Sequence, residues 1–377
     1  MPSPGNSVGI PPRDHEVEVS VFGPGFGESI AIHVGLGDWI VIDSCKSVGS
    51  KLSAPLVYLN SLGVDVSARV HLVIASHWHD DHIRGLTELF VAAKKARLVC
   101  PAAIRIEEFS HILNLAEEGS ETLQRLGVKQ MYESGVAEIS GLIRELSVRT
   151  AGTKPMYALG MRELWNRAGQ VPVIVRSLSP SDGEFQLAQQ RFAALALELQ
   201  DVVSRIPSLE PNDTSVVVSV IVQNDIGILL GSDLENRTIP ESGWDCVLEN
   251  WNNQTERHKV FKVSHHGSDN GHHDCVWTDM LGAEPIAVLT PFRKGRVNLP
   301  TSSNRTRLQK LSKQVFLTSL DRSRRFRLLD RTAQKTMEEH TEYLGRNPPY
   351  QRHVRLRTDL TTPDTWKVEL FGDAIRL

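Results

Sequence analysis

The sequence predicts a layered α/β fold, and three observations support this. Strand-like runs alternate with segments of helical spacing along much of the chain. The composition, 40% hydrophobic and 23% charged residues, is that of an ordinary globular protein with a sizeable core. The 377 residues fit one large domain with an insertion, or two domains. Disordered chains, collagen-like repeats and disulfide scaffolds are excluded.

The first part of the chain shows this alternation most clearly. Residues 1–15 are rich in Pro, Gly and Ser and are expected to form a flexible tail. Helical spacing occurs at 50–62 and 83–96. Strand-like runs occur at 17–22, 29–34, 39–42 and 70–75. The last of these is predominantly apolar, which is typical of a strand buried on both faces.

A mostly helical insertion is predicted at about 100–210, because apolar residues recur three and four apart. The helical windows are 110–126, 155–168 and 183–206. We interpret this insertion as a lid, a surface for a protein partner or a separate subdomain. Further strands are predicted at 171–178, 215–222, 226–230, 260–263, 285–289, 354–357 and 366–371, with a helix at 302–311. The main domain is assigned to 16–320, and 321–377 is assigned to a basic extension that packs on it.

The charge is unevenly distributed along the chain. The net charge is −3, yet residues 293–357 hold 17 Lys and Arg against 5 Asp and Glu. Such a balance fits either a surface that meets an anion, such as a phosphate backbone, or ordinary solvated faces. Residues 319–331 would line a nucleic-acid track, although Phe326 is their single aromatic residue.

The sequence shows no sign of a membrane span or of secretion. No apolar run approaches the ~20 residues that a membrane helix needs, and the first residues lack the pattern of a secretory signal. The cysteines form no CxxC pair and are expected to be reduced thiols. They are Cys45, Cys100, Cys246 and Cys275. We therefore expect a cytoplasmic protein.

The strongest chemical signal follows the strand at 70–75, where residues 76–82 read Ser-His-Trp-His-Asp-Asp-His. The candidate metal ligands are His77, His79, Asp81 and His82. Side chains two apart on extended backbone point the same way, so His77 and His79 form one group. Asp81 and His82, on the turn into a helix, form a second group. Two adjacent groups are what a dinuclear centre requires, and Zn²⁺, Mn²⁺ or Fe would suit these donors.

Two further clusters also follow predicted strands. His265 and His266 precede Gly267, and adjacent residues on extended backbone point in opposite directions, so one would bind metal and the other would face substrate. Asp233, after the strand at 226–230, is our choice for the bridging carboxylate, although it could instead cap a helix. Asp43, after the strand at 39–42, is expected to orient a ligand histidine or the nucleophilic water.

These motifs resemble those of the metallo-β-lactamase-fold hydrolases. Residues 77–82 match the HxHxDH signature, and Asp43, Asp233 and the histidine pair follow in the family's order. Within that superfamily the chain is most similar to the hydrolase domain of ComEC-type DNA-uptake proteins. The similar stretches are GPGFGESIAI and WIVIDSC within 23–45, SLSPSD at 177–182, NDTSVVVSV at 212–220, ILLGSDLE at 228–235 and FKVSHHGS at 261–268.

The resemblance implies a four-layer αββα sandwich and metal-assisted hydrolysis, often of phosphodiesters. It assigns one metal to His77 and His79 and the other to Asp81 and His82. Asp233 would bridge the two, and His265 or His266 would complete the second site. Two departures stand out. No counterpart is found for the extra histidine that many members place before the bridging Asp, which leaves the first metal with three protein ligands. An Asn…His-Pro motif is replaced by Asn-Leu-Pro at 298–300.

The expected mechanism uses two divalent metal ions, Zn or Mn, to lower the pKa of water from ~15.7 toward ~7. Asp81 or Asp233 would take the water's proton, and whichever of His265 and His266 is not a ligand would protonate the leaving oxygen. Ser268, Lys294 and Arg296 are candidate phosphate contacts.

Three functions are consistent with the sequence. The first is a phosphodiesterase or nuclease acting on DNA or RNA, which the basic C-terminal segment favours. The second is a hydrolase of a small phosphorylated, cyclic-nucleotide or carboxyl-derived substrate, which a lid would favour. The third is a metal-bound scaffold without activity, which the intact ligand set disfavours.

Overall fold

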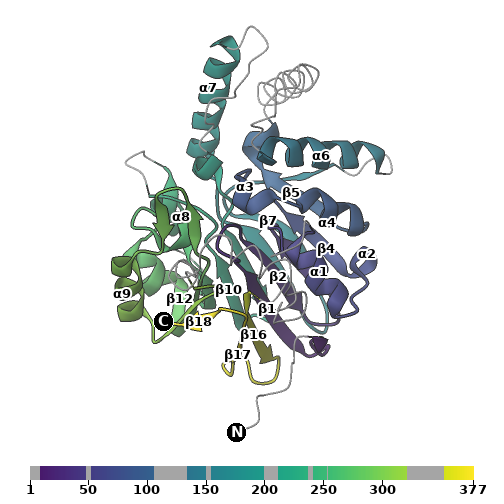
Figure 1. The fold of residues 1–377 in the computed structure, drawn as a ribbon, viewed down its shortest axis with the longest axis vertical. Helices are drawn as coiled ribbons and strands as arrows, with labels where there is room; N and C mark the ends of the chain where they lie inside the picture. The colour runs from purple at the N-terminus through teal and green to yellow at the C-terminus, as the bar shows by residue number, and fades with distance from the viewer. Residues whose placement is uncertain are drawn as a thin grey trace, which may run out of the picture.

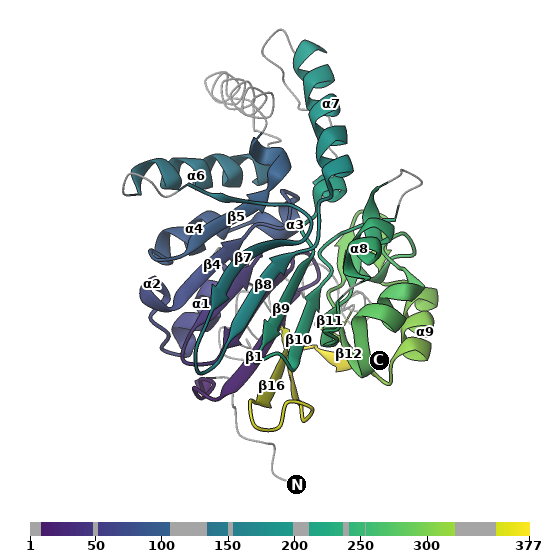
Figure 2. The same ribbon diagram turned by 180° about the vertical axis from the view of Figure 1, so that it is seen from behind.

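A computed structural model describes residues 9–47, 52–105, 134–149, 154–198, 211–236, 241–252, 254–320 and 352–377. Two large sheets lie face to face, and helices cover the outer face of each (Figures 1 and 2). This is the four-layer αββα arrangement that the sequence predicted.

The first sheet has eight strands and is mixed. In spatial order they are β17 (Lys367–Phe371), β16 (His353–Asp359), β1 (Glu16–Phe22), β2 (Ser29–Val34), β3 (Trp39–Ile42), β4 (Val70–Ile74), β5 (Arg97–Pro101) and β6 (Met156–Ala158). Pairing is antiparallel from β17 to β3 and parallel from β3 to β6.

The second sheet also has eight strands. Their order is β18 (Ile375–Arg376), β15 (Gln314–Leu317), β12 (Leu281–Leu289), β11 (His258–Lys262), β10 (Ile226–Leu230), β9 (Val218–Val222), β8 (Val173–Ser177) and β7 (Arg162–Arg167). The strands β10, β11, β12 and β15 are parallel neighbours. A separate hairpin follows β12 and consists of β13 (Phe292–Lys294) and β14 (Val297–Leu299).

Helices fill the outer layers. On the first sheet they are α1 (Ala54–Ser61), α2 (Val66–Arg69), α3 (Asp80–Ile83), α4 (Leu86–Ala92) and α6 (Ser134–Val148). On the second sheet they are α8 (Gly243–Trp251) and α9 (Ser302–Leu311), while α7 (Asp182–Glu198) stands out from the body in both ribbon views. Single turns occur at η2 (Ala102–Arg105), η3 (Pro211–Thr214), η4 (Ser264–Gly267) and η5 (Val276–Met280).

The largest hydrophobic core lies between the two sheets. It forms because alternate side chains of each strand point inward, as Val19 and Ile32 do from one sheet and Val220 and Ile228 from the other. Each outer layer of helices covers one further, smaller core. Burying an apolar side chain of this size contributes roughly 1.5–3 kcal/mol, so the sandwich gives the site a rigid support.

The predicted helix at 155–168 is wrong. The structure has β6 and β7 there, joined by a tight turn. Leu159 and Met161 lie in the turn, and Leu164 points into the core between the sheets. The spacing of these apolar residues along the sequence therefore imitates that of a helix. The predicted helical window at 110–126 lies outside the described residues, while that at 183–206 corresponds to α7 up to Glu198.

The C-terminal residues take part in both sheets. β16 pairs with β1 over seven residues, from Glu16 opposite Asp359 to Phe22 opposite His353. β18 pairs with β15 in the other sheet. Most of the basic segment at 319–331 lies outside the described residues. Among the helices that the structure describes, none is both long and apolar enough to cross a membrane.

Candidate metal centre

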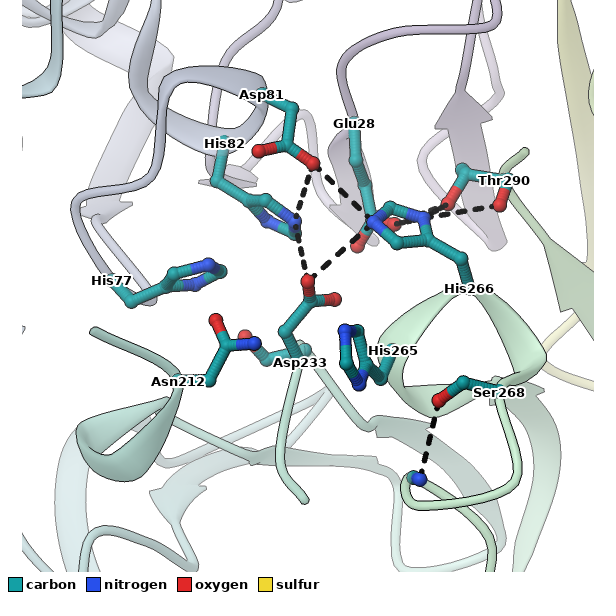
Figure 3. Close-up of polar contacts among 12 residues, drawn as sticks. Glu28, His77, Asp81, His82, Asn212, Asp233, His265, His266, Ser268 and Thr290 are labelled. Carbon is teal, nitrogen blue, oxygen red and sulfur yellow. Dashed lines mark hydrogen bonds and ion pairs between the residues drawn. The ribbon is translucent and has the colours of Figure 1, made fainter. Parts of the chain in front are cut away.

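The candidate site lies where parallel strands of both sheets end at the same edge of the sandwich. The loop after β3 carries Asp43. The loop after β4 carries His77 and His79, and α3, which follows it, carries Asp81 and His82. From the other sheet, the loop after β10 carries Asp233, and η4, directly after β11, carries His265 and His266. Figure 3 shows the side chains of His77, Asp81, His82, Asp233 and His266 pointing toward one another. The edge brings together residues more than 200 positions apart because carboxyl ends of parallel strands meet there.

Two carboxylates lie between two imidazoles at the centre. The Nε2 atoms of His82 and His266 each lie 3.4 Å from Oδ2 of Asp233. The same two nitrogens lie 3.6 and 3.3 Å from Oδ2 of Asp81. Ligand atoms of Glu28, His82, Asp233 and His266, all buried, lie within 4.8 Å of one another. Glu28 is not among the ligands that the sequence predicts.

Several buried polar atoms of this cluster have no hydrogen-bond partner among the described residues. They are Nε2 of His77, His82 and His266, Oδ2 of Asp81 and Oδ1 of Asp233. A buried polar group without a partner costs about 1–3 kcal/mol, so native proteins rarely leave several together. Divalent cations would satisfy these atoms, and mixed nitrogen and oxygen donors suit Zn²⁺, Mn²⁺ or Fe. The residues therefore fit a metal centre.

The other ring nitrogen of each of these histidines is bound to the protein. Nδ1 of His82 lies 2.8 Å from Oδ2 of Asp43, and Nδ1 of His266 lies 3.1 Å from the carbonyl oxygen of Thr290. Nδ1 of His77 lies 3.0 Å from Oγ of Ser76. Such contacts fix the ring orientation, and for His82 and His266 they place the proton on Nδ1 and leave Nε2 as a metal donor.

Asp43 connects the first ligand loop to the sheet. Its Oδ1 accepts a hydrogen bond from the backbone N–H of Ser76 at 2.7 Å, and its Oδ2 accepts one from Oγ of Ser76 at 2.7 Å. Together with the His82 contact, the carboxylate has three donors around it. Its position is that of a residue which orients a ligand histidine.

The backbone around the site is strained in a consistent way. Asp43, Ser232, His265 and His266 have φ values of 59°, 46°, 43° and 54°, in the left-handed region that non-glycine residues rarely adopt. Gly231 is required by a close approach, because a Cβ there would lie 2.1 Å from Oγ of Ser264. Because both histidines have left-handed backbone, the directions of their side chains do not follow the simple alternation of a strand.

In the metal-free protein the cluster carries protons where cations would bind. Burial lowers the pKa of His77 well below its usual value. Burial also opposes the charged form of His82 and His266, but the carboxylate of Asp233 and its neighbour Asp81 outweigh this. The pKa of His82 is raised well above its usual value, and that of His266 is raised to about 9. Burial raises the pKa of Asp233, yet the two imidazoles outweigh it and lower that pKa well below its usual value. Cations would replace these protons.

The side chains of His265 and His266 have different surroundings. His266 faces the carboxylates, whereas His265 lines the adjoining cavity and its Nδ1 lies 3.3 Å from Oε1 of Glu235. His79 also lines the cavity, and its ring centroid lies 5.0 Å from that of His77. The sequence had left open which of the pair points inward.

The cavity beside the centre has a volume of about 190 Å³. Its walls combine the ligand loops, Asn212 of η3 and the β13–β14 hairpin. They are formed by Trp78, His79, Asp80, Asp81, Asn212, Asp233, His265, His266, Phe292, Lys294, Val297 and Leu299. The predicted contact Lys294 is therefore at the cavity. Arg296 is exposed on the hairpin turn and is not among these lining residues in the described ranges.

Ser268 is buried beside the site but is used in its own turn. Its Oγ donates to Oδ1 of Asn270 at 2.6 Å and accepts from the backbone N–H of Gly271 at 3.2 Å. The hydroxyl therefore stabilises the loop after η4.

Sequence reasoning missed Glu28 and its partners. Glu28 precedes β2, its Oε1 lies 2.5 Å from Nζ of Lys262, and its Oε2 accepts a hydrogen bond from Oγ1 of Thr290. Lys262 is fully buried within β11. The available signal was Lys262 inside the otherwise apolar run at 260–263, because a buried charge is kept only when it is paired.

No family model matches the chain, and no curated protein matches it. The chain is similar to several solved structures. A metallo-β-lactamase from Cronobacter sakazakii with a HARLDQ motif is 13% identical, with a TM-score of 0.33 over 64% of this chain and 73% of the other. MEM-A1, a subclass B3 metallo-β-lactamase from a soil metagenome library, is 12% identical, with a TM-score of 0.31 over 72% and 87%. The short form of human tRNase Z is 10% identical, with a TM-score of 0.33 over 80% and 91%.

Proposed function

We propose that the protein is a metal-dependent hydrolase that cleaves phosphodiesters, with DNA or RNA as the substrate. One observation carries the hydrolase proposal: at one edge of the two sheets, buried donor atoms of three histidines and two aspartates converge, and they have no hydrogen-bond partner among the described residues. The phosphodiester assignment is supported by the resemblance of the motifs to ComEC-type domains and by the cationic Lys294 at the cavity.

The ligands would divide between two cations. His77 and His79 would hold one, Asp81, His82 and His266 the other, and Asp233 would serve both. Bound cations supply Lewis acidity, which lowers the pKa of water and neutralises charge on a phosphoryl group. The donor types leave Zn²⁺ and Mn²⁺ as the leading candidates.

Side chains of this protein would fill the other catalytic roles. Asp81 and Asp233 have oxygens at the centre and would accept the proton of the attacking water. His265 faces the cavity and would protonate the leaving oxygen, with Glu235 orienting its ring. Lys294 would attract the anionic substrate, while Trp78 and Phe292 would exclude water from one side.

A second candidate function is hydrolysis of a small phosphorylated, cyclic-nucleotide or carboxyl-derived substrate. The observation that favours it is the cavity of about 190 Å³, walled by the apolar side chains of the β13–β14 hairpin. A space of this size admits one phosphoryl or carboxyl group with little of its surroundings.

Turnover assays with Mn²⁺ or Zn²⁺ separate these functions. Plasmid DNA, single-stranded DNA, RNA and bis(p-nitrophenyl) phosphate would be compared for the wild type. Cleavage of a polymer supports the nuclease proposal, and cleavage of the small ester alone overturns it. His79→Ala and Asp233→Ala should each abolish activity on every substrate. Asp38→Asn, which alters a His–Asp contact at the opposite end of β3, should retain activity.

A cytoplasmic location, nucleic acid as the partner and a protein-binding role for the helical insertion are further parts of this proposal. They are supported by the sequence alone.

A further inference from the structure

One more buried polar atom faces the candidate metal centre, and it belongs to Asn212 of η3. The residue is 9% exposed, and its Oδ1 has no hydrogen-bond partner within the part of the chain that the structure describes. Figure 3 shows this amide beside Asp233 with its oxygen on the side of His77. The Nε2 atom of His77 is likewise buried without a partner.

The orientation of the Asn212 amide is fixed by chemistry. Its Nδ2 lies 2.8 Å from Oε1 of Glu235. A carboxylate can only accept hydrogen bonds, so the NH₂ group must face Glu235 and the oxygen must face the centre. Glu235 is also 3.3 Å from Nδ1 of His265. It therefore acts as a positioning residue for two side chains of the site.

The loop that carries Asn212 is joined to the first ligand loop. The backbone N–H of Ser215 donates to the carbonyl oxygen of Asn212 at 3.1 Å, and that of Val216 donates to the carbonyl oxygen of Ser76 at 3.0 Å. Ser76 directly precedes His77. The amide oxygen and the imidazole are therefore held in a fixed relation by backbone hydrogen bonds, as a preformed metal site requires.

We propose that Oδ1 of Asn212 is a metal ligand on the side of His77 and His79, at the point where the sequence lacks a third histidine. The inference rests on the metal centre of the proposed function. It gives this cation two imidazole nitrogens and one neutral oxygen from the protein, besides the shared Asp233. Amide oxygens suit harder cations such as Mn²⁺ better than an additional imidazole does. The site should therefore favour Mn²⁺ over Zn²⁺ more than a three-histidine site would.

The test measures metal binding and needs no substrate. Chelator-stripped protein would be titrated with Mn²⁺ while free Mn²⁺ is followed by electron paramagnetic resonance. The wild type should bind two Mn²⁺ ions, and Asn212→Ala should bind one of them roughly 10–100-fold more weakly, the usual range for loss of a supporting contact at a metal site. Asn250→Ala, on the exposed face of α8, is the matched control and should bind both ions as the wild type does.

Two substitutions keep the test decisive if Asn212→Ala does not fold. Asn212→Asp combined with Glu235→Gln retains an oxygen donor toward the centre, gives the new carboxylate an NH₂ group to face, and should keep both ions. Asn212→His supplies a nitrogen donor and should shift the ratio of Zn²⁺ to Mn²⁺ affinity toward Zn²⁺. A Glu235→Gln variant retains an acceptor for Nδ2 and should bind nearly as the wild type does.

The outcomes distinguish this inference from the function on which it rests. If the wild type binds no metal, the proposed metal centre is wrong. If the wild type binds two ions and the alanine variant binds both with unchanged affinity, the centre stands and Asn212 is not a ligand. An unchanged Zn²⁺ to Mn²⁺ ratio in the histidine variant would overturn the inference in the same way.

Discussion

Replacing Asp43 by Asn should weaken metal binding by about 10–100-fold, the range found for partners of metal-bound histidines. The reason is the proton on His82. In the wild type Oδ2 of Asp43 lies 2.8 Å from Nδ1 of His82 and holds the proton on that nitrogen, so a cation would displace only the proton on Nε2. In the variant an NH₂ group can take that place, and it can only donate.

The imidazole of His82 would then have to accept at Nδ1 and carry its proton on Nε2, which faces Asp81 and Asp233. A cation could bind Nε2 only if the proton moved to Nδ1, where it would face the NH₂ group of the variant and have no acceptor. A loss of 10–100-fold corresponds to about 1.4–2.8 kcal/mol at 1.4 kcal/mol for each factor of ten. The hydrogen bond from the backbone N–H of Ser76 to Oδ1 can be kept, so the fold should survive.

Competition with a chromogenic chelator measures the affinity, and a urea titration of metal-free protein checks the fold. Asp38→Asn is the matched control, because Asp38 lies 2.9 Å from Nε2 of His71 in a comparable pair at the opposite end of β3. Its metal affinity should equal that of the wild type. If Asp43→Asn also binds metal as tightly as the wild type, Asp43 does not set the proton position of His82 and the reasoning is wrong.

Three further predictions concern stability. Lys262→Met should lower the free energy of unfolding by about 3–5 kcal/mol, because it leaves the buried charge of Glu28 unpaired. In urea denaturation, adding Glu28→Gln should restore most of the lost stability, and a double variant no more stable than Lys262→Met would contradict this. Gly231→Ala should cost about 1–3 kcal/mol, since its Cβ would meet Oγ of Ser264 at 2.1 Å, whereas Gly160→Ala, with nothing closer than 3.6 Å, should change the melting temperature little. Burial lowers the pKa of His258 to about 4, from 6.5, so the unfolded chain binds more protons than the folded protein between these pH values. The free energy of unfolding should therefore fall as the pH drops through that window, by at most about 1.4 kcal/mol per pH unit. His258→Gln should flatten this slope, and an unchanged slope would argue against the assignment.

The parts of the fold that were predictable from the sequence are those set by local pattern. The strand before residue 76 and the strands before Asp233 and His265 are marked by apolar runs, and polar ligands follow each at the same relative position. Because parallel strand ends share an edge, the convergence of these loops could be expected. The place of Asp43 at the same edge, beside His82, could be expected for the same reason.

The parts that were not predictable depend on contacts between distant segments. Glu28 accepts a hydrogen bond from Thr290, which is 262 positions away in the sequence, because the two sheets face each other. No local sequence pattern indicates such a contact. The inward choice of His266 depends on left-handed backbone at both histidines, which periodicity does not reveal. β6 and β7 were mistaken for a helix because strands this short, joined by a turn with apolar residues, imitate helical spacing.

The pairing of β1 with β16 has a consequence for how the molecule is made. During synthesis β1 leaves the ribosome early, but the neighbour that covers its outer edge begins only at His353. Until then the nascent chain exposes an unpaired row of backbone N–H and C=O groups, to which another chain can add. Newly made protein should therefore be most prone to aggregate before its final strands emerge.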